Sequence, residues 1–203
     1  MEMLVFALLA GAGIHLINKG EQAQRIALLG RHLGQYNVEK LMEQVTEGYI
    51  RALDTPDAGR RQQIWATLTG AEQELSSQFA RFVADFAGVY GEHAQVSRLP
   101  VAVPRSTKLF PRACFDMRKV LAVHAKGIAN VVANAKGLNP RDKAFALTAE
   151  LYLMQHSCHW FCKSKNVASA RLLARHKTSY AQVLDAVTPA TRDAYVRVVG
   201  GEG

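Results

Sequence analysis

Apolar side chains recur at intervals of three and four residues along most of this chain, and this spacing is the strongest constraint on its fold. Side chains three and four positions apart share one face of an α-helix, whereas a half-buried β-strand alternates them every second residue. One clear stripe comprises Val38, Leu41, Met42, Val45, Tyr49 and Leu53. Another comprises Ile64, Leu68, Leu75, Phe79, Phe82, Val83 and Phe86. The pattern predicts amphipathic helices packed around an apolar core.

Three helix starts are marked by a capping residue followed directly by proline: Thr55-Pro56, Asn139-Pro140 and Thr188-Pro189. The capping side chain accepts a hydrogen bond from the first turn, and Pro suits the first helical position because an N–H there would have no partner. We also expect Asn18-Lys19-Gly20 to break a helix. The expected helices cover residues 3–17, 21–33, 37–53, 56–90 (with an interruption near Gly70 as an alternative), 115–135, 140–163, 166–187 and 189–199. The sequence thus predicts an all-α fold, an irregular bundle of seven to eight helices.

Residues 92–113 interrupt the helical pattern. Pro100, Pro104 and Pro111 fall in this segment, and because Pro cannot donate a backbone hydrogen bond, a regular central strand is disfavoured. The segment is nevertheless more apolar than a free linker, because it contains Leu99, Val101, Val103, Leu109 and Phe110. We expect an extended, proline-containing crossover packed over a single helical domain, residues 1–203. A domain boundary within the crossover is the alternative.

Residues 3–17 are apolar apart from His15. A helix of this length would extend about 22 Å, which is shorter than the roughly 30 Å hydrocarbon core of a bilayer. The segment therefore fits a buried core helix or a helix embedded at a membrane surface. A signal peptide is a third interpretation, disfavoured because Glu2 stands where a positive charge is usual. The residues expected to contact a membrane are Leu4, Val5, Phe6, Leu8, Leu9 and Ile14.

Charge is unevenly distributed along the chain. Residues 1–100 carry 9 basic and 11 acidic side chains, whereas residues 101–203 carry 16 basic and 6 acidic ones. No acidic residue lies between Glu150 and Asp185, where the basic residues are Lys163, Lys165, Arg171, Arg175 and Lys177. Such a one-sided field attracts anions, so these five residues are the candidate site for an anionic partner. A solvated helix face without a partner is the alternative.

Cysteine and histidine cluster within residues 156–162. If this segment is helical, Cys158, His159 and Cys162 share an arc of about 100°, and thiolate with imidazole suits zinc. A metal or heme site is therefore one interpretation, and a redox-active thiol is another. The competing interpretation is core packing, because a stripe of apolar residues follows helical spacing: Leu147, Leu151, Met154, Cys158, Phe161 and Cys162. With only three cysteines in the chain, we expect a reducing compartment, the cytoplasm.

No motif identifies a reaction, since the GxxxxGK[ST], GxSxG and HExxH patterns do not occur. We therefore expect a non-enzymatic interaction or scaffold protein without a cofactor. It would be cytoplasmic, peripheral to the inner face of a membrane, and would engage a protein partner or an anionic membrane surface through its basic C-terminal half. The alternatives are a zinc- or heme-binding protein and a nucleic-acid binder.

Overall fold

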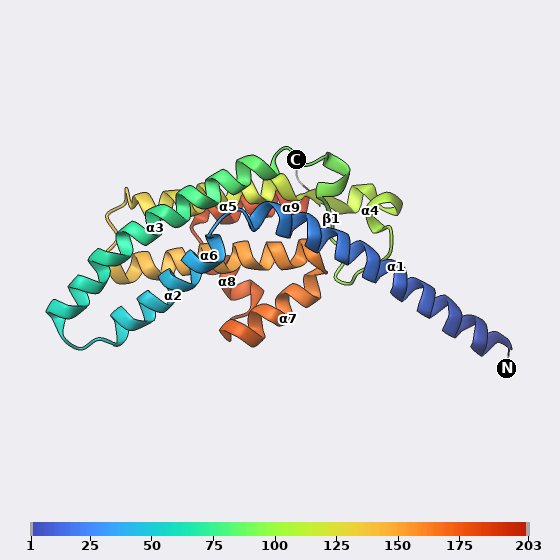
Figure 1. Ribbon diagram of the computed structural model, residues 1–203, viewed down its shortest axis with the longest axis horizontal. Coiled ribbons are helices and arrows are strands. Elements are labelled where there is room, and N and C mark those ends of the chain that lie inside the picture. The colour runs from blue at the N-terminus through green and yellow to red at the C-terminus, as the bar shows by residue number, and fades with distance from the viewer. Residues whose placement is uncertain (1, 202–203) are drawn as a thin grey trace.

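The computed structural model describes the backbone of residues 2–201 and the side chains of residue 13 and residues 15–201. Its helices are α1 (Glu2–Leu33), α2 (Val38–Asp54), α3 (Ala58–Phe86), α4 (Ser106–Leu109), α5 (Met117–Ala133), α6 (Pro140–Cys162), α7 (Lys165–His176), α8 (Tyr180–Ala186) and α9 (Pro189–Gly200). Over these residues the predicted all-α fold is confirmed, with eight of the nine α-helices at least seven residues long. Figure 1 shows them packed as an elongated bundle.

The predicted break at Asn18-Lys19-Gly20 is wrong, because α1 continues through these residues as one helix. An interior Gly costs a helix only about 1 kcal/mol, and the second half of α1 offsets that cost by burying Leu29 in the core. The side chain of Asn18 does not cap a helix. Its Nδ2 donates to the carbonyl of Ala102 in the crossover at 3.2 Å.

Two other predicted helices differ from the observed ones. The predicted helix 166–187 is divided into α7 and α8, because Lys177 adopts a left-handed conformation (φ 55°) and Ser179 starts α8 with a capping box to Gln182. The predicted start of α3 at Thr55-Pro56 is two residues early, since Asp57 is the residue that accepts the capping hydrogen bond. The alternative interruption near Gly70 does not occur, because α3 is continuous.

The other two predicted caps are confirmed. Asn139 accepts a hydrogen bond from the backbone N–H of Asp142 at the start of α6. Thr188 accepts one from Thr191 at the start of α9. Side-chain caps of this kind typically contribute about 1 kcal/mol each, and they fix where α6 and α9 enter the bundle.

Helix α6 is the central element, packing against α1, α2, α5, α7 and α8. Five of the six residues predicted as its core stripe are buried: Leu147, Leu151, Met154, Cys158 and Phe161. The sixth, Cys162, is only partly buried. Phe161 meets Phe86 of α3 edge-on, with ring centroids 5.9 Å apart, and Phe86 continues into a row with Phe82 and Phe79. This aromatic row joins α3 to α6.

The segment predicted as an extended crossover contains little regular structure between two short strands. Strand β1 (Gln95–Ser97) pairs antiparallel with β2 (Cys114–Asp116), and the 3-10 turns η1 (Gly91–Ala94) and η2 (Pro111–Ala113) precede them. Trp160 of α6 donates from its indole nitrogen to the carbonyl of Ser97 at 2.9 Å. The crossover is therefore fastened to the central helix, and α4 lies in the loop between the strands.

Among the described residues, no helix combines the length and the apolar character needed to cross a bilayer.

Candidate functional site

The N-terminal half of α1 projects from the bundle, whereas the second half lies along it (Figure 1). Leu16 and Ile17 near the point of departure are 66% and 43% exposed. Leu4, Val5, Phe6, Leu8, Leu9 and Ile14, the residues expected to contact a membrane, have side chains outside the described ones. The backbone thus places the apolar segment of residues 3–17 outside the body of the protein.

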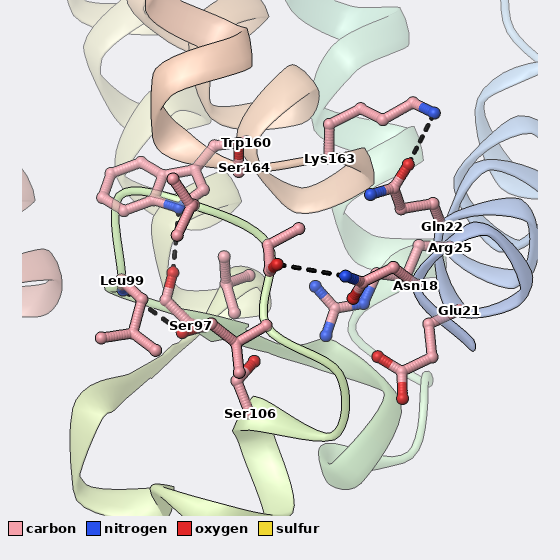
Figure 2. A pocket seen from close by; sticks show the side chains of 14 residues that line it. Asn18, Glu21, Gln22, Arg25, Ser97, Leu99, Ser106, Trp160, Lys163 and Ser164 are labelled. Atoms are coloured by element: carbon pink, nitrogen blue, oxygen red, sulfur yellow. Dashed lines mark hydrogen bonds between the residues drawn. The ribbon is translucent and has the colours of Figure 1, made fainter. Parts of the chain in front are cut away.

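Polar contacts fasten α1 to the bundle where the projection begins (Figure 2). The carboxylate of Glu21 accepts from the backbone N–H of Arg105 at 3.0 Å. Lys163 donates to the side chain of Gln22 at 2.8 Å, and Arg25 donates to the carbonyl of Phe161 at 3.3 Å. The space enclosed between these groups has a volume of only about 20 Å³, enough for roughly one water molecule. The arrangement is a joint between α1, α6 and the crossover.

Beside this joint, the loop that contains α4 presents apolar and basic side chains together. We call its exposed residues the crossover face: Val101, Arg105, Lys108, Leu109, Phe110 and Arg112. Val101, Leu109 and Phe110 are 54%, 62% and 50% exposed. The three apolar residues were expected to pack over the bundle, and no role was predicted for the three basic ones. The signal that could have found them is the absence of any acidic residue between Glu92 and Asp116.

The five basic residues predicted as an anion site do not act alike. Lys163 is engaged with Gln22, and the ammonium of Lys165 lies 5.4 Å from the ring centroid of Trp160 and 5.1 Å from that of Tyr180. Arg171, Arg175 and Lys177 are exposed on α7 and at its C-terminal end. Lys177 donates to the carbonyl of Ala174 at 3.1 Å, so Arg171 and Arg175 are the members of the set that remain most available to an anionic partner.

Arg175 borders a groove whose other wall is acidic. Three glutamates and one lysine of α2 line the groove together with Arg175 and His176: Glu39, Lys40, Glu43 and Glu47. The glutamates are one turn apart along α2, so they share a face. They weaken the field of α7 on this side, and we expect an anion to approach Arg171 and Arg175 from the side away from α2.

Cys158, His159 and Cys162 line a cavity of about 240 Å³ between α1, α2 and α6. Burial raises the pKa of the Cys158 thiol above its usual range, and it raises the pKa of Cys162 to about 11. Both thiols are therefore protonated at neutral pH. No group of three or more His, Cys, Asp or Glu side chains in the described part of the chain is arranged to hold a metal ion.

The most deeply buried imidazoles belong to a different part of the bundle. His124 and His156 are both 0% exposed. His124 Nε2 lies 2.9 Å from the hydroxyl of Ser157, and His156 Nε2 lies 3.1 Å from that of Ser169. The Nδ1 atom of each ring has no hydrogen-bond partner. Burial lowers the pKa of each to about 3, so both rings are neutral. The spacing of residues in the sequence could not predict these two pairs, because each pair joins two different helices: α5 with α6 and α6 with α7.

Glu150 is also fully buried, at 0% exposure. One carboxylate oxygen accepts from the backbone N–H of Thr188 at 3.2 Å, while Oε2 has no partner. Burial raises the pKa of this carboxyl. A side chain at Gly127 would collide with Oε2 and with the hydroxyl of Thr191. Gly127 therefore lets α5 approach the buried carboxyl closely, which gives Glu150 a structural role between α5, α6 and α9.

Comparison of the chain with known protein families, with characterised proteins and with solved structures finds no match. Function must therefore be argued from the geometry alone.

Proposed function

We propose that this chain is a non-enzymatic interaction or scaffold protein that attaches to the cytoplasmic face of a membrane through residues 3–17. The observation that carries the proposal is the projection of the N-terminal half of α1 from the bundle (Figure 1). No charged residue lies between Glu2 and Lys19. A helix that is apolar on all sides needs an apolar environment on all sides, and each large apolar side chain left in water forgoes about 1.5–3 kcal/mol.

A bilayer suits this helix better than a partner helix does. A partner helix would cover a stripe of side chains at heptad spacing, whereas residues 3–17 have no polar face that would remain in water. Lys19, two residues after the end of the apolar segment, is exposed. Basic residues on one side of an apolar segment favour the cytoplasmic side, which orients the bundle toward the cytoplasm.

The exposed cations of α7 are the second element of the proposal. Arg171 and Arg175 are one turn apart and exposed, and we propose that they engage an anionic partner at the membrane. The strongly perturbed imidazoles, His124 and His156, are inaccessible in the core, which supports a role in binding over one in catalysis. We do not propose a zinc or heme site, because no group of three or more His, Cys, Asp or Glu side chains among the described residues is arranged to hold a metal ion.

Vesicle co-sedimentation tests the attachment. The full chain is expected to sediment with vesicles of phosphatidylcholine and phosphatidylglycerol (70:30), and the double substitution Phe6→Asp with Leu9→Asp is expected to abolish sedimentation. The matched control is Phe145→Asp with Leu173→Asp, which changes a Phe and a Leu that are 56% and 53% exposed on the body. Equal sedimentation of both double variants would contradict the proposal.

Charge reversal tests the α7 element separately. Arg171→Glu with Arg175→Glu is expected to abolish capture of an anionic partner from the membrane fraction while vesicle attachment persists. Lys136→Glu with Arg141→Glu, which reverses two exposed cations elsewhere, is the control. Unchanged capture by the α7 variant would contradict this element, and salt-sensitive binding to random duplex DNA that the variant loses would identify the anion as nucleic acid.

A further inference from the structure

We infer that the crossover face forms a second contact with an anionic phospholipid surface, beside the N-terminal half of α1. This inference rests on the proposed attachment of residues 3–17 and adds a separate part of the chain to it. The contact would be made by the apolar side chains of Val101, Leu109 and Phe110 and by the basic side chains of Arg105, Lys108 and Arg112.

Exposed apolar side chains concentrate at this end of the molecule. Thirteen large apolar residues are exposed among the described ones, and five of them lie here: Leu16, Ile17, Val101, Leu109 and Phe110. Single exposed apolar residues need no explanation, but a group of them marks an interaction surface. Ile17 and Val101 are each adjacent in sequence to one partner of the hydrogen bond between Asn18 and the carbonyl of Ala102. The two exposed residues therefore belong to segments in direct contact.

The charge of the crossover face is of one sign. No acidic residue occurs between Glu92 and Asp116, while four basic residues do. Arg98 is hydrogen-bonded within the protein, because its guanidinium donates to the carbonyls of Arg112 and Val198. The side chains of Arg105, Lys108 and Arg112 are exposed. Two carboxylates, Glu21 and Glu92, line the groove beside Arg105 and Lys108. Four cations line that groove in all, so the basic charge there is in excess. Glu21 accepts from the backbone N–H of Arg105.

A mixture of cations with exposed Leu and Phe selects a bilayer among anionic surfaces. The cations meet lipid phosphates while the apolar side chains enter the boundary between headgroups and acyl chains. Against the sugar-phosphate backbone of a nucleic acid, Leu109 and Phe110 would be buried against charged groups at a cost. The combination is that of an interfacial membrane contact.

The position of the crossover face fits the headgroup region. Residues 3–17 end one residue before Asn18, which is bonded to the crossover, and Glu21 is bonded to the start of α4. When α1 is embedded, the crossover face is therefore held where the helix leaves the bilayer. Interfacial segments combine Lys and Arg with Phe and Leu at that level.

The experiment compares four forms of the full chain on two kinds of vesicle. The forms are the parent, Lys108→Gln with Arg112→Gln, Lys136→Gln with Arg141→Gln as the matched control, and Phe6→Asp with Leu9→Asp. The loop between α5 and α6, which precedes Arg141, lies at the opposite end of the bundle from the N-terminus (Figure 1). The vesicles are phosphatidylcholine alone and a mixture of phosphatidylcholine with phosphatidylglycerol (70:30).

Each cation at an anionic surface strengthens partitioning about five-fold. The Lys108→Gln/Arg112→Gln variant is therefore expected to bind anionic vesicles about thirty-fold more weakly than the parent, and neutral vesicles equally well. The control is expected to match the parent on both. Parent-like binding of the Lys108→Gln/Arg112→Gln variant to anionic vesicles would overturn the crossover contact.

Failure of the crossover contact is distinguishable from failure of the α1 attachment. If Phe6→Asp/Leu9→Asp loses binding to both vesicle types and Lys108→Gln/Arg112→Gln matches the parent, only the crossover contact is overturned. If Phe6→Asp/Leu9→Asp still binds anionic vesicles and Lys108→Gln/Arg112→Gln does not, the proposed attachment of residues 3–17 is overturned and the crossover contact stands. If the crossover contact forms, the Lys108→Gln/Arg112→Gln variant has two fewer charges facing the lipid, and salt weakens its binding less than it weakens that of the parent. Equal salt dependence of the variant and the parent would count against the crossover contact.

Discussion

Two buried neutral imidazoles should make this protein sensitive to mild acid. The pKa of His124 and that of His156 are each lowered to about 3 by burial, from an ordinary value of 6.5. The unfolded chain therefore binds more protons than the folded chain between these values, and the free energy of unfolding falls as the pH falls below about 6.5. At pH 5.0 each ring reduces that free energy by about 2 kcal/mol relative to pH 7.5.

The two rings together remove about 4 kcal/mol, a large part of the roughly 5–15 kcal/mol that stabilises a typical domain. Glu150 acts in the opposite direction, because burial raises its pKa and the carboxyl stabilises the fold more as the pH falls. The measurement must therefore isolate the imidazoles, by comparing the parent with variants that keep Glu150.

Urea unfolding at pH 7.5 and 5.0 provides that comparison. His156→Gln removes one titrating ring, and the loss of stability between the two pH values is expected to be about 2 kcal/mol smaller than in the parent. His124→Gln should behave alike, and His93→Gln, which changes a side chain that is 62% exposed, should retain the parental pH dependence. An unchanged pH dependence in both buried-ring variants would refute the reasoning.

Three further predictions concern single sites. Gly127→Ala is expected to lower the free energy of unfolding by more than about 2 kcal/mol in urea, because the new methyl group collides with Glu150 and Thr191; parental stability would contradict the close approach. Lys177→Gly is expected to raise the free energy of unfolding by up to about 1 kcal/mol, because Lys177 has φ 55°. The midpoint of thermal unfolding should rise accordingly, and a lower midpoint would contradict this. Cys162 is expected to react with iodoacetamide more than about a hundred-fold slower at pH 8 than a free thiol, because its pKa is about 11, and a rate like that of free cysteine would show that the thiol is not buried.

The helices of the bundle could be predicted from the sequence where apolar spacing and caps agree. The stripe that begins at Val38 became α2, and Asn139 and Thr188 cap α6 and α9 as expected. Errors arose where tertiary contacts override local signals. Gly20 does not end α1, because the helix is held on both sides of it, at Asn18 by the crossover and at Leu29 by the core. Lys177 ends α7 in a left-handed conformation that usually favours Gly. The end of α7 could therefore not be predicted from the residue at this position.

The candidate sites were harder to predict from the sequence than the helices, because each site depends on contacts between segments that are far apart in the chain. The basic run from Lys163 to Lys177 is continuous in sequence, yet Lys163 turns to Gln22 and Lys165 to two aromatic rings. The crossover face combines residues whose exposure could not be inferred from their apolar character. Leu109 and Phe110 were expected to pack inward, and they are exposed instead. The attachment of residues 3–17 and the cytoplasmic location remain predictions.

The most direct test of the central claim is the depth of residue 9 in a bilayer. Burial raises the pKa of the native thiols Cys114, Cys158 and Cys162, so a fluorophore can be attached selectively to a Leu9→Cys variant at neutral pH. With vesicles that contain lipids brominated along the acyl chain, we predict strong quenching of this fluorophore and none of one attached through Phe145→Cys. Equal, negligible quenching at both positions would show that α1 does not enter the bilayer and would contradict the proposed function.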